Sequence, residues 1–328
     1  MISRPDRQAD SRAPRPNKPP SRARVPVSAV PPLTGRDRWI LRMVHEHRVL
    51  TTDQLAALAF PTVKIARRRL AILYEYRVLE RFRPLRQRGS APHHWTLAPN
   101  GASILAAEAG VRSRELGYNH QHTLTVAHAL HLNRTVAVNG WFTALITEPG
   151  HGAHVSRWWS RSRCQRLWGD LADPDAFGRY THPEASLDFF LVYEPPTTAA
   201  RVATMLHGYD ELARTTGTVT PVLWWEPTSA REARVRAVLA QAWQSLPDPE
   251  AVPLATATAE LLPGLTPPGP AAPVWLPLHT STATRLPLHR LAAGWPRAML
   301  TTDPDQQAMP SRRATLLAAP PPQPPTDW

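Results

Sequence analysis

Proline is distributed very unevenly along this chain of 328 residues, and its distribution limits where a packed core can form. Of 37 prolines, 8 lie in residues 1–32 and 18 in residues 247–328, whereas residues 33–246 contain only 11. Proline lacks a backbone N–H and breaks helix interiors and central strands. We therefore expect the folded part within 33–246, between a loose leader and a proline-rich tail.

Basic residues are concentrated in the first third of the chain. Residues 1–120 hold 22 lysines and arginines against 9 acidic residues, whereas residues 121–328 hold 16 against 17. The excess of +12 therefore belongs to the first third, which we expect to meet a polyanion. Only two of the 38 cations are lysines, Lys18 and Lys64, a bias that we attribute to a GC-rich genome rather than to function.

The cysteine count and the hydropathy of the chain limit the cellular compartments in which we expect the protein. Cys164 is the only cysteine, which excludes an internal disulfide and a cysteine-based zinc site. No apolar run approaches the ~18 residues of a membrane span. The leader has no apolar segment of the kind that secretory signals carry. We expect a cytoplasmic protein without a membrane partner.

Three short helices are predicted one after another near the start of the folded part. The first covers about residues 34–47, the second opens at Thr51, and the third, capped by Thr62, ends near residue 76. Thr51 and Gln54 have the spacing of a capping box, in which side chain and backbone satisfy each other's polar groups.

The third helix has an apolar face and a basic face. At 100° per residue, the buried arc holds Val63, Ala66, Leu70, Leu73 and Tyr74. Lys64, Ile65 and Arg68 fall roughly opposite, with Arg67 and Arg69 beside them. A helix fits the major groove of DNA, where such cations donate to phosphates and to guanine edges. The predicted contacts are Thr62, Lys64, Arg67, Arg68 and Arg69, with an ordinary solvated face as the alternative.

A β-hairpin is predicted directly after this helix. Residues 78–85 and 93–97 have strand composition, and residues 87–90 are typical of a turn. A hairpin that follows a basic third helix is the wing of a winged helix-turn-helix domain, and a fourth helix is expected at 102–109. The predicted DNA contacts on the wing are Arg81, Arg83, Arg86 and Arg88.

A long helix over residues 119–147 is expected to connect two domains. Four histidines lie near its start: His120, His122, His128 and His131. Because no cysteine and no carboxylate lies near them, we interpret them as polar helix positions rather than as a metal site.

From residue 153 the pattern alternates between strands and helices, which favours a mixed or parallel sheet covered by helices. Strands are expected at 155–159, 186–193, 219–225 and 274–278, and helices at 199–215 and 230–243. The tryptophan pairs 158–159 and 224–225 are interpreted as core. The expected boundaries are a disordered basic leader (1–32), a winged-helix domain (33–117), a connecting helix (118–150), an α/β domain (151–262) and a mostly disordered tail (263–328).

Residues 33–243 resemble the replication-relaxation proteins of actinobacterial plasmids and integrated elements. The shared pieces are residues 33–38 (LTGRDR), 50–55 (LTTDQL), 67–73 (RRRLAIL), 174–179 (PDAFGR), 187–191 (LDFFL) and 208–209 (GY). The resemblance implies an α+β or α/β protein in which a winged helix-turn-helix is followed by a restriction-endonuclease-like domain of mixed α/β type. It also implies a role in plasmid replication or DNA processing.

Nucleases of that fold hold a divalent metal ion between a Pro-Asp carboxylate and an acid-x-Lys strand. Asp175 matches the first element. In relatives, the strand that corresponds to residues 187–191 tends to continue with Glu, one further residue and then Asp. This chain has Val192 and Glu194 at those two positions. Relatives often carry a lysine on the next helix, where this chain has Met205. If the domain is a nuclease, Asp175 and Glu194 are its catalytic candidates and Mg²⁺ its cofactor.

Two observations favour a degenerate nuclease fold without catalytic residues, metal or cofactor. No lysine follows Lys64, and Arg163 or Arg201 would be poor substitutes because arginine stays protonated. Asp188 and Glu194 share strand parity but would lie roughly 20 Å apart, too far to share one ion.

The leading hypothesis is a non-catalytic DNA-binding protein of a plasmid or integrative element, acting in replication, DNA processing or its regulation. Its partners would be double-stranded DNA and plasmid replication or transfer proteins. The alternatives are a metal-dependent DNA nickase and a chromosomal winged-helix transcriptional regulator. A symmetric site would require a dimer, which the sequence leaves open.

Overall fold

The computed structural model describes residues 25–84, 90–120, 132–195, 198–260, 269–278, 284–301 and 318–325. The chain is a mixed α and β protein with two sheets, and it divides into two compact units. The first unit comprises Pro5–Thr143 with Asp303–Trp328, and the second comprises Ala144–Thr302 with Met1–Arg4. Within the described residues, no helix is both long and apolar enough to cross a membrane.

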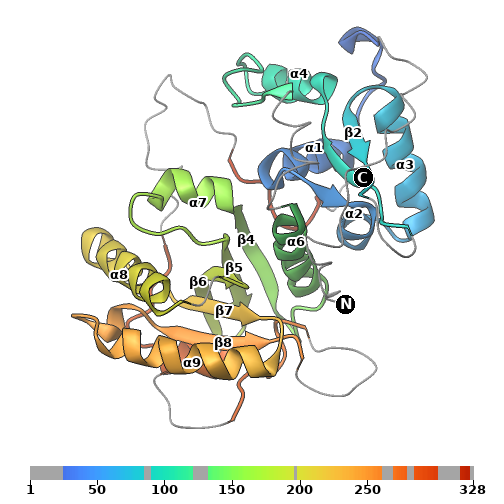
Figure 1. Cartoon of the computed structure of the whole chain (residues 1–328). Helices are drawn as coiled ribbons and strands as arrows, with labels where there is room; N and C mark the ends of the chain where they lie inside the picture. Colours follow the sequence, from blue (N-terminus) through green and yellow to red (C-terminus); the bar gives the residue numbers. More distant parts are fainter. Residues whose placement is uncertain are drawn as a thin grey trace. The chain divides into compact units, whose positions relative to one another are not determined.

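The first unit alternates short helices and short strands (Figure 1). In chain order they are α1 (Gly35–His47), β1 (Leu50–Thr51), α2 (Thr52–Ala59), α3 (Val63–Glu75), β2 (Leu79–Phe82), β3 (His94–Leu97) and α4 (Pro99–Glu108). The three strands form an antiparallel sheet in the order β1-β3-β2. The helices therefore precede the β2–β3 hairpin, and β1 pairs with the strand by which the hairpin returns.

Side-chain caps fix where the first three helices begin. Thr34 with Asp37 forms a capping box at α1, and Thr51 with Gln54 forms the predicted one at α2. The Thr62 hydroxyl accepts a hydrogen bond from the Ile65 N–H, which confirms Thr62 as the cap of α3. The caps satisfy N–H groups that have no partner inside the helix, and so the sequence predicts these starts well.

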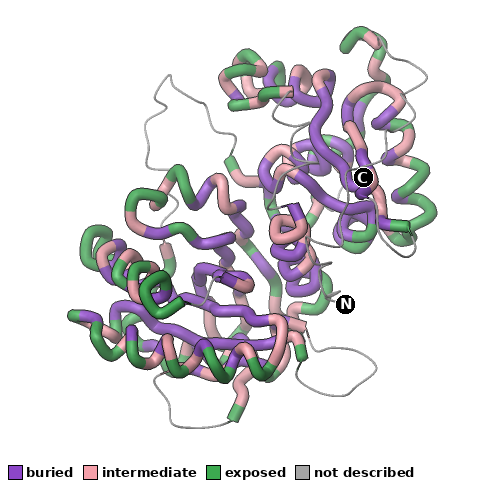
Figure 2. The backbone as a smooth tube through the Cα atoms, viewed as in Figure 1, coloured by how far each residue is buried: buried purple, intermediate pink, exposed green. Residues whose placement is uncertain are grey.

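The buried face of α3 is the one expected, except at its first residue. Ala66, Leu70, Leu73 and Tyr74 are buried, and the purple stretches of Figure 2 mark this inner side. Val63 is 39% exposed instead. Helical side chains lean toward the N-terminus, so a residue in the first turn has no preceding turn to pack against.

The N-terminal part of α6 (Leu132–Thr147) belongs to the first unit. Gln54 Nε2 donates to the Val136 carbonyl at 2.8 Å, and Asn139 Nδ2 donates to the Val49 carbonyl at 2.7 Å. These bonds fasten the helix to α2 and to the α1–β1 turn. The predicted helix start with His122, His128 and His131 lies outside the described residues.

The second unit is built on a six-stranded sheet in the order β4-β5-β6-β7-β8-β9. Its elements are β4 (His154–Ser160), α7 (Arg161–Trp168), β5 (Ala176–His182), β6 (Ala185–Tyr193), α8 (Ala199–Thr216), β7 (Val222–Glu226), α9 (Ser229–Gln244), β8 (Leu254–Thr258) and β9 (Leu276–Pro277). Strands β6, β7 and β8 are parallel to one another, and the other neighbours are antiparallel. Trp158, Trp159, Trp224 and Trp225 are buried in the core, as predicted.

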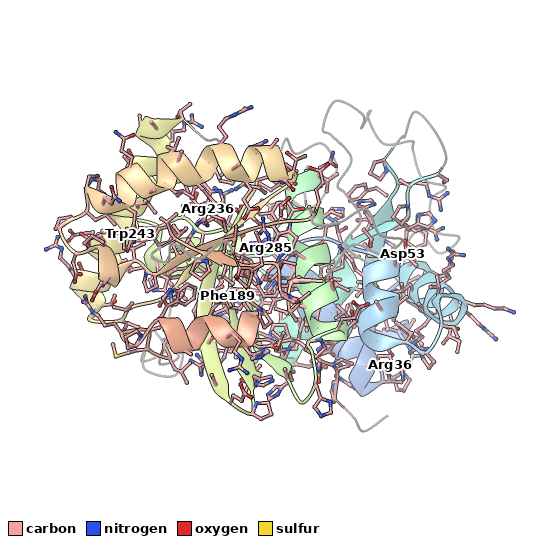
Figure 3. The ribbon with its side chains drawn as sticks, turned by 90° about the horizontal axis from the view of Figure 1, so that it is seen from below. Arg36, Asp53, Phe189, Arg236, Trp243 and Arg285 are labelled. Atoms are coloured by element: carbon pink, nitrogen blue, oxygen red, sulfur yellow. The ribbon has the colours of Figure 1, made fainter. Side chains whose placement is uncertain are left out.

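Residues 269–278 and 284–301 are part of the second unit. The expected strand at 274–278 is present in part as β9, whereas the expectation that the rest of this stretch is mostly disordered was wrong. The two ranges include β9 and α10 (Leu288–Leu291), and Trp275 is fully buried. Figure 3 shows α9 and α10 on opposite sides of the strands and labels Arg236 on α9 and Arg285 on the segment 284–301. Arg285 Nη2 donates to buried Glu232 of α9 at 2.6 Å, so an ion pair holds this segment against α9.

Candidate nucleic-acid interface

The outer face of α3 presents cations to solvent. Lys64, Arg67 and Arg68 are exposed, and so is the capping residue Thr62. Ile65 and Ile72 lie on the same side as Arg68 and are 48% and 36% exposed. Exposed cations next to exposed aliphatic groups suit the major groove, where guanine offers acceptors and thymine a methyl group.

Arg69, a predicted DNA contact, instead forms a paired contact inside the protein. Its guanidinium binds both carboxylate oxygens of Asp37, with Arg69 Nε 2.8 Å from Asp37 Oδ1. The Asp37 side chain is fully buried and the Arg69 side chain is 29% exposed. Burial acts to raise the pKa of Asp37, but hydrogen bonds from Arg69 and Thr34 lower it overall. Arg69 therefore ties α3 to α1.

Two of the four arginines predicted to contact DNA from the hairpin, Arg81 and Arg83, lie within the described residues and against the hairpin. The Arg81 guanidinium lies 4.4 Å from the Tyr74 ring centroid and 5.8 Å from that of Trp95. Such stacking holds a guanidinium in place without removing its charge. Arg83 Nη1 donates to Ser90 Oγ at 2.9 Å, beyond the strand ends on the loop side of the hairpin. The predicted contacts Arg86 and Arg88 lie outside the described residues.

His93 lies where positive charges from both α3 and the hairpin act on it. Burial lowers the pKa of this imidazole to about 4, together with the positive charges of Arg83, Arg81, His94 and Arg67. Arg67 comes from α3, whereas Arg81 and Arg83 come from the hairpin arm. The electrostatic field of the two elements therefore converges beside His93, as expected for a surface that binds a polyanion.

The same shift predicts how stability depends on pH. The unfolded chain protonates His93 near pH 6.5, whereas the folded unit resists protonation down to about pH 4. Stability is thus fully present above pH 6.5 and is lost as pH falls toward 4. Between pH 7 and pH 4.5, the free energy of unfolding of His93→Gln should fall by about 1–2 kcal/mol less than that of the wild type, after discounting for solvent screening. Urea unfolding at pH 7 and pH 4.5 measures it; an identical pH dependence in both proteins would contradict the assignment.

In the second unit, strand pairing brings together the ends that carry Asp175 and Glu194. Asp175 precedes β5 and Glu194 follows β6, and these strands pair antiparallel with Ala176 opposite Leu191. Asp175 Oδ2 accepts from the Tyr193 N–H at 2.8 Å, and the Glu194 N–H donates to the Trp225 carbonyl at 2.8 Å. Residues nearly twenty positions apart thus share one edge of the sheet.

The cation beside Asp175 is Arg161, which the sequence did not single out. Arg161 Nη1 lies 3.7 Å from Asp175 Oδ1, and its Nε lies 3.2 Å from Asp173 Oδ1. Of the two arginines considered from the sequence, Arg163 is 2% exposed within α7 and Arg201 is exposed on α8. The signal that would have found Arg161 is its position directly after a strand end, at the edge where Asp175 lies.

The sequence analysis also did not single out a second acidic residue at this edge. Glu226 ends β7, is fully buried, and accepts from Trp224 Nε1 at 2.8 Å. Burial raises its pKa, Arg231 acts in the opposite sense, and Glu194 adds to the rise. Among the described residues, no three histidine, cysteine, aspartate or glutamate side chains are arranged to hold a metal ion.

Tyr209 completes the surroundings of Asp175. Its hydroxyl is buried and has no hydrogen-bond partner among the described residues. Burial raises its pKa well above the usual value, and the negative charge of Asp175 adds to this. The preceding residue, Gly208, lets α8 approach the 171 turn, because a Cβ there would lie 2.1 Å from the Leu171 carbonyl oxygen.

This close approach predicts a large effect of a small substitution. Gly208→Ala should lower the free energy of unfolding by about 1–3 kcal/mol, since either α8 or the 171 turn must shift. The matched control is Gly140→Ala on α6, where the nearest atom is the side-chain nitrogen of Gln54 at 3.4 Å. The control should be neutral or stabilising by up to about 1 kcal/mol. Equal losses in thermal unfolding would refute the close approach.

Comparison with known proteins gives one match. Residues 41–234 match the profile of the family described as replication-relaxation. No curated protein and no solved structure matches the chain. The matched range covers more than half of the chain and runs from α1 into α9.

Proposed function

The chain belongs to the replication-relaxation family, and from that membership and the geometry of α3 we propose that it is a non-catalytic, double-stranded-DNA-binding protein that acts in replication or DNA processing. The observation that carries the proposal is the set of exposed cations on the outer face of α3, Lys64, Arg67 and Arg68, on a helix that directly precedes a hairpin with Arg81 and Arg83. A plasmid or an integrative element is the setting that we propose for it.

The element order of the first unit supports a winged helix-turn-helix. The order α1-β1-α2-α3-β2-β3, with β1 beside β3, places a helix, a tight turn and a second helix directly before a hairpin. In such domains the second helix of that pair lies in the major groove and reads base edges. We assign α3 to the groove and the β2–β3 hairpin to the wing.

Individual roles follow from exposure and from existing partners. Lys64 and Arg68 are exposed on the outer face and are assigned to base edges, where they donate to guanine O6 and N7. Arg67 faces the hairpin and is assigned to phosphate, together with Arg81 and Arg83. Arg69 positions α3 through Asp37 and is not assigned to DNA.

Binding to phosphates releases counterions, and this gives a direct test. The logarithm of the association constant should fall linearly with the logarithm of salt concentration, with a slope of about −0.9 for each phosphate contact. We expect retardation of duplex DNA by the full chain at 50 mM salt and a loss of at least about tenfold in affinity by 200 mM. Salt-independent retardation, or none at low salt, would refute the proposal.

For the second unit we propose a degenerate restriction-endonuclease-like fold that serves as a platform. In a working site Asp175 would hold Mg²⁺, and Asp175 and Glu194 are the only acids at the two motif positions. Here Arg161 Nη1 lies 3.7 Å from Asp175 Oδ1, so a fixed cation lies beside the carboxylate that would hold the metal ion. An arginine cannot supply the bound water that hydrolysis requires.

The nuclease alternative makes an opposite prediction. Supercoiled plasmid incubated with the full chain and Mg²⁺ or Mn²⁺ should stay supercoiled over hours, and Asp175→Ala should behave like the wild type. Nicking that requires the metal and disappears in Asp175→Ala would establish the enzyme instead. Arg161→Lys restores the residue type of active nucleases near Asp175 and serves as the sensitive control for residual activity.

A further inference from the structure

A proline-rich segment near the C-terminus packs on the first unit. In Ala318–Pro325, five of eight residues are proline. Pro320 and Pro322 are buried, whereas the intervening Pro321 and the following Gln323 are exposed. The segment therefore has one side against the protein and one side in solvent, although it belongs to a region whose composition predicts no packing at all.

Two side chains of α1 hold its backbone. Trp39 Nε1 donates to the Pro321 carbonyl at 2.8 Å, and Arg42 Nη2 donates to the Ala318 carbonyl at 3.1 Å. The Trp39 side chain is nearly buried, at 3% exposed. Each contact joins residues about 280 positions apart in the sequence, so no local turn explains them.

The two contacts recur at the same sequence interval on both segments. Trp39 and Arg42 are three residues apart on α1 and so lie on one face of the helix. The acceptors, Pro321 and Ala318, are also three residues apart, and the order of the contacts shows that the segment runs antiparallel to α1. Three helical residues rise about 4.5 Å and three residues of an extended proline-rich chain about 9.3 Å, so the long Trp39 and Arg42 side chains span the difference.

Proline chemistry explains why such a surface selects this ligand. Proline has no N–H, so a proline-rich segment cannot form a regular helix or sheet ladder of its own, and carbonyls of the segment remain available as acceptors. Polyproline II is already extended, so little chain entropy is lost when it docks. An aromatic surface that carries an N–H donor is the recurring way to recognise it.

We propose that the face of α1 around Trp39 and Arg42 is a binding site for proline-rich peptides, occupied by Ala318–Pro325 of the same chain. Because the segment is tethered, its effective concentration at the site is about millimolar. A free peptide of the same sequence therefore competes poorly with it. A proline-rich segment presented by another protein would bind once the tail is displaced.

The test uses the full chain and a fluorescein-labelled peptide of residues 318–325. A tail variant carries Pro320→Ser, Pro321→Ser and Pro322→Ser, which removes the buried prolines and keeps the chain length. Fluorescence anisotropy should show that the tail variant binds the peptide at least about tenfold more tightly than the wild type does, because the site is no longer occupied in cis. A peptide with the same three serines is the control ligand and should bind neither protein.

Substitutions at Trp39 and Arg42, made in the background of the tail variant, test whether the peptide binds to this face of α1. Trp39→Phe keeps the aromatic ring and removes the N–H, and Arg42→Met keeps the aliphatic stem and removes the donor. Each should weaken the peptide by about fivefold to tenfold, in line with the loss of one hydrogen bond. Unchanged binding in both, or equal binding of wild type and tail variant, would overturn the proposal. Arg42 is partly exposed, so Arg42→Met remains informative if Trp39→Phe fails to fold.

Discussion

Replacing Lys64, Arg67 and Arg68 together with alanine is expected to lower the affinity for duplex DNA by about 100-fold or more. The three side chains are exposed on the outer face of α3 and are assigned to base edges and to phosphate. A base contact of this kind is worth about 1–3 kcal/mol, and each lost phosphate contact removes about one unit from the salt slope. Electrophoretic mobility shifts at several salt concentrations measure both quantities.

The matched control removes the same charge elsewhere. Arg112, Arg201 and Arg234 are exposed and lie outside α3 and the hairpin. Their triple replacement by alanine should change affinity by less than about threefold, because only the long-range field is reduced. Equal losses in the two triple variants would show that net charge, rather than the face of α3, determines binding.

Replacing Arg69 with alanine is expected to destabilise the first unit by about 3 kcal/mol, the usual cost of leaving one member of a buried ion pair without its partner. The Asp37 side chain is fully buried and would keep only its bonds with Thr34. The loss should appear in chemical unfolding, with a lower midpoint and a slope close to that of the wild type.

Three comparisons isolate the ion pair. Arg68→Ala, one residue away but exposed, should change stability by no more than about 0.5 kcal/mol. Combining Asp37→Asn with Arg69→Ala should cost less than the sum of the single changes. The pKa of Asp37 is lowered, so its contribution is present above the unfolded pKa and is lost as pH falls below it. Additive single costs, or a destabilisation by Arg69→Ala that does not shrink as pH falls below the unfolded pKa of Asp37, would contradict the pairing.

Local signals predicted the first unit well because short-range chemistry determines its helix starts. Thr51, Gln54 and Thr62 act within one turn of their partners, and a sequence displays such partners directly. The partner of Arg69 is 32 residues away, and no periodicity in α3 distinguishes Arg69 from Arg68. A basic helix face therefore identifies the surface that we propose meets DNA, but not which of its cations already has a partner.

The second unit was harder to predict for two reasons. Strand β5 contains Arg179, which indicates exposure in a sequence, but Asp188 lies directly opposite in β6 and pairs with it at 2.5 Å. The expected strand 219–225 begins at Val222, because Pro221 cannot donate to a ladder and Val219 instead forms an isolated bridge with Ala298. Long-range partners decide both outcomes.

The proline-rich tail shows that composition alone does not predict which segments dock on the protein. High proline content correctly indicates a segment that cannot form regular helices or a central strand. It does not exclude docking, because Pro320 and Pro322 bury their rings while Trp39 supplies the donor. Composition indicates which regular secondary structures a segment cannot form, but whether the segment is ordered depends on the surface against which it packs.

Selection of binding sites from a random duplex library tests the DNA-binding role of α3 most directly. The full chain and its Lys64→Ala, Arg67→Ala, Arg68→Ala variant are each taken through repeated rounds of capture at 150 mM salt, and the retained DNA is sequenced. A recurring motif for the wild type and none for the variant is the predicted result, because direct contacts to base edges carry the sequence preference. The same motif from both proteins, or no motif from either, would contradict the assignment of α3 as the element that reads DNA.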